Sequence, residues 1–359
     1  MTVVAVLGAG GGGQSAAVEL SQAGHRVRLW NRREETLAAI RQQGCVRFRG
    51  VLGEGSVRPD LVTTDLDEAL DGADVAVVCL PSIAHEAVFA DLASRLGDRP
   101  LVLNPGHTGG ALHARECWRR AGCPLPPIAE LSTLTYVARV HDDVVTTTGR
   151  ATLVRGAALP GGRAALDAAV ELFPGVEPAS NVLVSSLSNV NLVLHPPGAL
   201  LGLSWVEATR GDFTFYVDGM TPAVARVMAA LDGERVAVAR AFGLEVAGLV
   251  EEMRRIGTVE PEDARTGSLA EAVRGGRANA TIKAPDSTAH RYYREDFPFG
   301  LLPFLALASV AGVPVPTASA LLELASAAVG PGLLEHGLDA AALGVAGLDA
   351  DALVRSVSG

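Results

Sequence analysis

The first third of the chain alternates short, nearly uninterrupted apolar runs with longer segments whose apolar residues recur every three or four positions. Continuous apolar runs are typical of parallel strands that are buried on both faces, and the spacing between them is that of amphipathic helices. We therefore expect an α/β fold with a doubly wound parallel sheet. The predicted strands are residues 3–8, 26–30, 74–81 and 100–106, and the predicted helices are residues 15–23, 33–43 and 163–172.

The pattern changes near residue 181, where strand signals fade and helical periodicity takes over. This change predicts two domains, an α/β domain over residues 1–180 and a mostly α-helical domain over residues 181–359. The predicted helices of the second domain are residues 222–242, 268–274, 301–311 and 318–328. The apolar character of the last of these makes it a candidate face for a homodimer through the C-terminal domain.

A glycine-rich loop follows the first predicted strand. The segment LGAGGGGQSA contains the pattern G-x-G-x-x-G at Gly8, Gly10 and Gly13, directly before a predicted helix. In that setting the first glycine permits a tight turn, the second lets the backbone approach a diphosphate, and the third allows close helix–strand packing. The loop therefore predicts a Rossmann-type dinucleotide-binding domain over residues 1–180. A purely structural glycine turn is the alternative.

The second predicted strand ends at Asn31, Arg32 and Arg33. Sites specific for NAD usually place an acidic residue here to bind the ribose hydroxyls. A neutral asparagine removes the repulsion of a 2′-phosphate, and a guanidinium can pair with that phosphate through two hydrogen bonds. We therefore expect NADP to be preferred over NAD as the cofactor. Alternatively, both arginines are solvated at the start of a helix.

Composition and charge exclude several classes of protein. The formal net charge of −10 argues against nucleic-acid binding, which requires a basic surface. The uncharged run 297–322 is long enough to suggest a membrane span, but Pro303, Pro314 and Pro316 interrupt it, so a buried helix is the better interpretation. The chain starts directly in a strand-like run without a basic segment, so we expect no signal peptide and a cytoplasmic location.

Five segments spread over the chain carry a stronger signal than the glycine loop. Together they resemble the octopine/nopaline (opine) dehydrogenase family over essentially the full length. The resemblance implies reductive condensation of an amino acid, or another amine, with a 2-oxo acid: an imine forms and is reduced by a nicotinamide cofactor to a secondary amine. The segments are NPGHTGGAL (104–112), SLSNVNLVLHPPG (186–198), FYVDGMTPAV (215–224), LDGERVAVARAFGL (231–244) and RYYREDFPFGLLP (291–303).

The same resemblance implies roles for three residues: His195 as the catalytic histidine, Asp296 as its carboxylate partner, and Arg291 as a ligand of the substrate carboxylate. These roles are chemically consistent, since a histidine exchanges protons near neutral pH and a carboxylate on its far nitrogen fixes the tautomer. Pro196 disfavours a helical conformation at His195, so we expect a helix to end there. No histidine pair with metal-ligand spacing accompanies His195, so we expect no metal.

Other polar residues near these segments have less certain roles. Asn191, and Asn189 before it, could bind the substrate or the cofactor amide, or satisfy local backbone groups. His107 could contact the substrate or face solvent. Lys283, the only lysine, could face the site or be exposed.

Each assignment has an alternative. His195 could be a core residue, and Arg291 and Asp296 an ordinary surface pair. The chain could also be a related reductase of a 2-oxo acid or of a preformed imine. A protein of another class, which senses NADP(H) without turnover, is a further alternative. In that case His195, Asp296 and Arg291 would not need to converge.

Overall fold

The computed structural model describes residues 1–358, and the chain divides into two compact units. The first unit contains Met1–Gly106 and Ala114–Val182. The second contains the short segment His107–His113 and the chain from Leu183 onward. The functional domains 1–180 and 181–359 stay a prediction, because compactness alone assigns no function to either unit.

The first unit is built on an eight-stranded sheet with the doubly wound arrangement that was predicted. All neighbouring strands are parallel except β8 and β11, which are antiparallel, so the sheet is mixed rather than fully parallel. Strands β1, β6 and β7 are completely buried or nearly so, which explains their continuous apolar sequence. In spatial order the strands are β12 (Val176–Pro178), β11 (Val154–Ala158), β8 (Ile128–Leu131), β7 (Leu101–Leu103), β6 (Val75–Val78), β1 (Val3–Leu7), β2 (Arg26–Trp30) and β5 (Leu61–Thr63).

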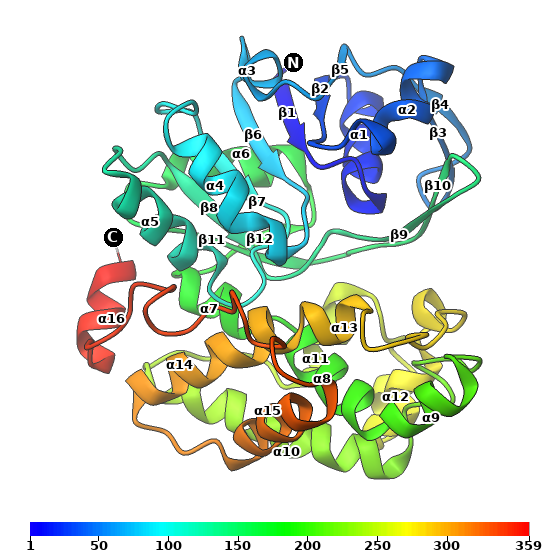
Figure 1. Cartoon of the computed structure of the whole chain (residues 1–359), viewed down its shortest axis with the longest axis vertical. Coiled ribbons are helices and arrows are strands. Elements are labelled where there is room, and N and C mark those ends of the chain that lie inside the picture. The colour runs from blue at the N-terminus through cyan, green and yellow to red at the C-terminus, as the bar shows by residue number, and fades with distance from the viewer. Residues whose placement is uncertain (359) are drawn as a thin grey trace. The chain divides into compact units, whose positions relative to one another are not determined.

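Helices cover both faces of this sheet, with α4 in front of it and α6 behind it in Figure 1. Helix α2 ends at Gly44, whose φ of 65° is the left-handed conformation that favours glycine at the end of a helix. Helix α1 begins four residues earlier than predicted, so the last three glycines of the loop form its first turn. The helices are α1 (Gly11–Gln22), α2 (Glu34–Gln43), α3 (Leu66–Leu70), η1 (Ser82–Ala84), α4 (His85–Ala93), α5 (Gly110–Ala121) and α6 (Arg163–Leu172).

A second sheet of four strands, which the sequence did not predict, packs against α1. Its strands are short and alternate buried apolar with exposed charged positions, as Val46, Arg47, Phe48 and Arg49 do. Such alternation over a few residues is a weak signal beside the continuous apolar runs of the main sheet. In spatial order the strands are β4 (Gly55–Val57), β3 (Val46–Gly50), β10 (Val144–Arg150) and β9 (Tyr136–His141).

The second unit is mostly helical, as predicted, and each of its four predicted helices is present within about two residues of the expected bounds. Helix α10 packs against α8, α12, α14 and α15. It starts where Thr221 accepts a hydrogen bond from the Val224 amide and Pro222 takes the first helical position. The helices are α7 (Val182–Leu187), α8 (Asn191–Leu201), α9 (Leu203–Thr209), α10 (Pro222–Ala241), α11 (Leu249–Ile256), η2 (Asp263–Arg265), α12 (Leu269–Gly275), η3 (Arg277–Asn279), α13 (Arg291–Arg294), η4 (Phe297–Leu301), α14 (Leu302–Ala311), α15 (Pro316–Val329) and α16 (Ala350–Val357).

The prediction that a helix ends at His195 is wrong. Helix α8 continues through Pro196 and Pro197 to Leu201. The prolines remove the amide donors that would bond the carbonyls of Leu192 and Val193. Every residue from Leu192 to Ala199 is buried. Burial of this apolar surface in the tertiary structure therefore outweighs the local preference against the helix.

The uncharged run 297–322 forms a π-helical turn, η4, followed by α14 and the first half of α15. Prolines lie at the first or second position of each of these elements, where a missing amide donor costs least. Within residues 1–358 no helix has both the length and the apolar composition needed to cross a membrane.

Candidate active site

The structure brings His195 and Asp296 together in the interior of the second unit. Nδ1 of His195 lies 2.8 Å from a carboxylate oxygen of Asp296, and only 2% of the histidine side chain is exposed. Because a carboxylate accepts hydrogen bonds, Nδ1 carries the hydrogen, and the neutral ring then has its lone pair on Nε2. The interpretation of Asp296 and Arg291 as a surface pair is therefore wrong, since Asp296 is buried and bound to His195.

Two elements hold this pair in place. His195 lies in the middle of α8. Asp296 is separated from the end of α13 by Glu295 and directly precedes η4, whose i to i+5 bond runs from the Leu301 amide to the Asp296 carbonyl. Both α13 and η4 pack against α8. Turns of π-helix often occur at functional sites, where they redirect one side chain without breaking the helix.

The other ring nitrogen of His195, Nε2, also has a hydrogen-bond partner. Nε2 lies 2.7 Å from the hydroxyl oxygen of Tyr216, and the ring of Tyr292 stacks on the imidazole with centroids 4.0 Å apart. Burial raises the pKa of Tyr216 well above its ordinary value, so its hydroxyl keeps its proton at neutral pH. Neither tyrosine was expected to have a role, although they lie in the segments FYVDGMTPAV and RYYREDFPFGLLP.

Arg291 is an exposed cation beside this cluster. Its guanidinium carbon lies 5.8 Å from the centroid of the Tyr292 ring. Its guanidinium makes no hydrogen bond or ion pair with any residue of the described chain. The side chain is exposed, so the guanidinium is accessible to an anionic ligand. Its positive charge also lowers the pKa of Tyr216, against the larger effect of burial.

His107 neither faces solvent nor stands alone. Its Nε2 lies 3.2 Å from a carboxylate oxygen of Glu295, and both side chains are largely buried. Its backbone has a φ of 57°, a conformation that few residues other than glycine adopt. Glu295 immediately precedes Asp296, so two consecutive carboxylates each hold one histidine. The possibility that His107 faces solvent is therefore wrong.

The two asparagines before His195 differ. Asn189 is buried and satisfies local groups, since its amide nitrogen donates to Thr108 and its oxygen accepts from the backbone of Asn191. The half-buried side-chain amide of Asn191 has no hydrogen-bond partner among residues 1–358. Lys283 is exposed and pairs with Asp212 at 2.8 Å. Of the two asparagines, only Asn191 has a side-chain amide without a hydrogen-bond partner in the described part of the chain.

The glycine loop of the first unit has a geometry that fits a dinucleotide. A Cβ on Gly13 would lie 1.7 Å from the carbonyl oxygen of Gly8, and one on Gly8, whose φ is 119°, would lie 2.5 Å from that of Cys79. A Cβ on Gly10 would meet no atom within 4 Å. The first and third glycines are thus required by packing, whereas the second leaves open space above the backbone that caps α1. A diphosphate needs such space.

The residues after β2 suit a 2′-phosphate. The oxygen of Asn31 accepts from the Ala9 amide at 3.2 Å and its amide nitrogen donates to the Arg33 carbonyl at 3.1 Å, so this side chain braces the glycine loop. Arg32 and Arg33 are exposed, and within the described residues neither guanidinium has an ionic or hydrogen-bonded partner. Two free positive charges therefore lie beside the loop.

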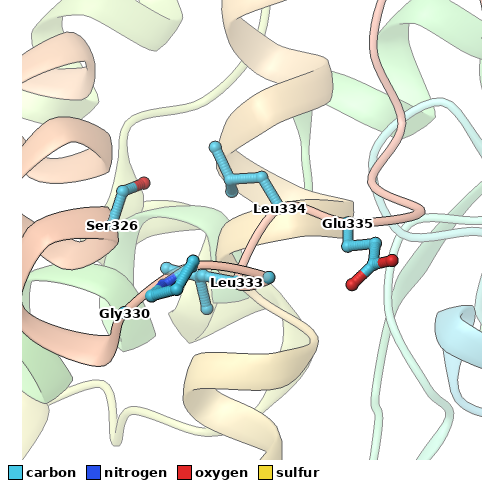
Figure 2. A pocket seen from close by; sticks show the side chains of 7 residues that line it. Ser326, Gly330, Leu333, Leu334 and Glu335 are labelled. Atoms are coloured by element: carbon cyan, nitrogen blue, oxygen red, sulfur yellow. The ribbon is translucent and has the colours of Figure 1, made fainter.

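The second unit also has a surface depression that is separate from the predicted site residues. A depression of about 410 Å³ lies after α15 and is lined mainly by Gly330–Glu335, which contribute apolar surface and one carboxylate (Figure 2). None of the predicted site residues lines it. The described part of the chain contains no group of three or more His, Cys, Asp or Glu residues that could hold a metal ion.

Comparison with known sequences identifies similar proteins over the whole chain. The model of the NAD/NADP octopine/nopaline dehydrogenase α-helical domain matches residues 178–329, and the model of ketopantoate reductase PanE/ApbA matches residues 4–104. An opine dehydrogenase of Arthrobacter sp. (strain 1C) is 33% identical over 357 residues, which cover 98% of each chain. The protein ocs of Agrobacterium tumefaciens (strain Ach5) is 27% identical and is covered completely.

Solved structures agree with this comparison at the level of the fold. An octopine dehydrogenase with NADH and L-arginine superposes with a TM-score of 0.75 at 22% identity, covering 99% of this chain and 98% of the other. A yersinopine dehydrogenase with NADP+ bound gives a TM-score of 0.73 at 19% identity, covering 99% and 97% of the two chains.

Proposed function

The chain belongs to the opine dehydrogenase family of NAD(P)-dependent oxidoreductases, and we propose that it joins the amine of an amino acid, or another amine, to a 2-oxo acid. The product is a secondary amine that carries the carboxylate of the 2-oxo acid and, where the amine is an amino acid, the carboxylate of that amino acid as well. The observation that carries this proposal is the buried His195–Asp296 pair beside the exposed Arg291. The relatives named above bind NADH with L-arginine in one case and NADP+ in the other, which supports an amino acid substrate and a nicotinamide cofactor.

The proposed chemistry needs a group that gives and takes protons. The amine attacks the oxo carbon, the resulting carbinolamine loses water after its hydroxyl is protonated, and the imine accepts a hydride that the nicotinamide supplies when bound. A histidine held at Nδ1 by a carboxylate is suited to this role, because the carboxylate stabilises the imidazolium that forms when Nε2 takes up a proton. We assign that role to His195 and the supporting role to Asp296.

Three residues are proposed to bind the substrates. Arg291 is the candidate partner for a substrate carboxylate, since its free guanidinium can form two parallel hydrogen bonds with it. Asn191 offers an unused amide four residues before His195, which is one turn of α8. His107, held by Glu295, is the candidate contact for a second polar group of the substrate.

The cofactor is proposed to bind at Gly8, Gly10 and Gly13, with Asn31, Arg32 and Arg33 beside the ribose. NADPH is the preferred cofactor in this proposal because two unpaired guanidinium groups lie where a 2′-phosphate would be placed, and no carboxylate occupies position 31.

The experiment that tests the function is a matrix of amino acids against 2-oxo acids, with consumption of NADPH and NADH followed separately. We expect oxidation of the cofactor only when both an amine and a 2-oxo acid are present. The His195→Ala variant should lose about two to four powers of ten in turnover while still binding the cofactor.

Other outcomes of the matrix would identify a different activity. Oxidation by a 2-oxo acid alone would identify a hydroxy-acid-forming reductase, and activity only on a preformed imine would identify an imine reductase. Turnover by His195→Ala equal to that of the parent protein would end the catalytic assignment.

A further inference from the structure

Both ring nitrogens of His195 are bound to protein side chains. Nδ1 donates to Asp296 and Nε2 accepts from the Tyr216 hydroxyl, at 2.8 and 2.7 Å. The ring faces are equally enclosed, with Tyr292 stacked on the imidazole and Phe215 at its edge. With 2% of its side chain exposed, His195 has no nitrogen that a substrate reaches without displacing a hydrogen bond.

The hydroxyl of Tyr216 is hydrogen-bonded to Nε2 of His195 and lies within the electrostatic influence of Arg291. Its single hydrogen points to Nε2, since Nδ1 carries the hydrogen of the neutral ring. The resulting chain of hydrogen bonds runs from Asp296 through His195 to Tyr216.

The backbone around Tyr216 is firmly held. The oxygen Oδ2 of Asp218 accepts hydrogen bonds from both the amide and the hydroxyl of Thr214, at 2.8 and 2.7 Å, which closes a tight turn around the tyrosine. The Phe215 amide donates to the carbonyl of Ile282 at 2.9 Å, which fixes this turn to a second segment. A side chain on Gly198 would lie 2.8 Å from the Phe215 ring, so the glycine after HPP lets this turn approach α8.

We propose that Tyr216 is the residue through which His195 exchanges its proton during the reaction. This inference rests on the proposed function, because it assigns the path of the proton in that reaction. A hydroxyl suits the position because it accepts a hydrogen bond from an imidazolium and donates one to a neutral imidazole. His195 thus acts through Tyr216, whose hydroxyl passes the proton to and from the reacting atoms.

The proton transfer balances without any further reagent. In the dehydration step, imidazolium Nε2–H passes its proton to the Tyr216 oxygen while the hydrogen of that hydroxyl passes to the carbinolamine hydroxyl, which leaves as water. Tyr216 ends neutral with one hydrogen, and His195 ends neutral with its remaining hydrogen directed to Asp296. The reverse sequence of transfers takes the proton from the attacking ammonium group.

The test compares Tyr216→Phe with Tyr293→Phe. Each removes one buried hydroxyl and keeps the ring, but the Tyr293 hydroxyl donates only to the backbone carbonyl of Ala199. We expect Tyr216→Phe to lower kcat about 100-fold, with the KM of both substrates and the Kd of NADPH within about twofold. The pH dependence of kcat should change in Tyr216→Phe and be retained in Tyr293→Phe. Equal kcat values and pH profiles in the two variants would overturn the inference and leave the proposed function intact.

A second measurement does not depend on activity. In protein labelled with 15N-histidine, the signals of His195, assigned through His195→Ala, report which nitrogen carries the hydrogen. We expect a protonated Nδ1 and an Nε2 signal that moves in Tyr216→Phe but not in Tyr293→Phe. If the parent protein oxidises no cofactor with any substrate pair, the proposed function fails, and these signals still decide the contact. An Nε2 signal unaffected by Tyr216→Phe would overturn it.

Discussion

At the scale of single residues, the environment of a side chain determines what its chemistry can be used for. An isolated histidine on an apolar helix is most often a core residue, and by burial alone His195 would be one. The carboxylate at Nδ1 distinguishes it, because a carboxylate there fixes the tautomer and stabilises the imidazolium that forms when Nε2 takes up a proton. The same comparison separates Asn189, whose amide is used locally, from Asn191, whose amide is not.

The cofactor preference is also set by individual side chains. We expect the double variant Arg32→Ser with Arg33→Ser to lose about tenfold to a hundredfold in kcat/KM for NADPH, since a charge-assisted hydrogen bond is worth about 1.5–3 kcal/mol. The value for NADH should stay within about twofold, because NADH lacks the phosphate. Steady-state kinetics with both cofactors measure this, and Arg163→Ser removes another exposed arginine as the control. An equal loss with both cofactors would contradict the phosphate contact.

At the scale of elements, one glycine loop combines a packing requirement with a binding function. Gly13 permits α1 to approach β1, because any Cβ would collide with the backbone of Gly8. Gly10 has no such neighbour and an ordinary φ of −74°, so packing does not require glycine there. We therefore expect a side chain at position 13 to lower the stability of the fold and one at position 10 to affect cofactor binding.

This separation is testable with two alanine variants. Gly13→Ala should lower the free energy of unfolding by about 1–3 kcal/mol, as overpacking of a core does. Gly10→Ala should change it by less than about 0.5 kcal/mol and yet weaken NADPH binding, because its methyl group fills the space proposed for the diphosphate. Denaturant unfolding and cofactor titration measure the two effects.

The control is Gly233→Ala, which lies in open space within α10 and should stabilise the protein slightly. Unchanged NADPH affinity in Gly10→Ala would argue against the proposed position of the diphosphate.

At the scale of the whole molecule, the exposed side of α15 is the candidate surface for self-association. Ala320, Leu324, Ala327 and Ala328 are exposed along this helix, and Leu324 keeps 59% of its surface accessible. We propose that this stripe forms the interface of a homodimer, because apolar residues at helical spacing lose contact with water when two such faces meet.

Light scattering coupled to size exclusion tests the assembly. We expect twice the mass of one chain for the parent protein, and a single chain for Leu324→Glu, since the introduced carboxylate would be buried without a partner. Leu201→Glu places the same charge at another exposed leucine and should leave the mass unchanged. A parent protein with the mass of one chain would contradict the homodimer.

The sequence by itself predicted the doubly wound sheet with four of its strands, the glycine loop, four helices of the second unit and, through the family resemblance, the pairing of His195 with Asp296. These features follow from local periodicity, from turn residues and from family motifs that can be recognised directly in the sequence. Only the tertiary structure decided that α8 continues through two prolines, that β3, β4, β9 and β10 form a second sheet, and that Glu295 holds His107. It also placed Tyr216 at the open nitrogen of His195. Each of these depends on contacts between residues far apart in the chain, where burial and hydrogen bonding outweigh local preference.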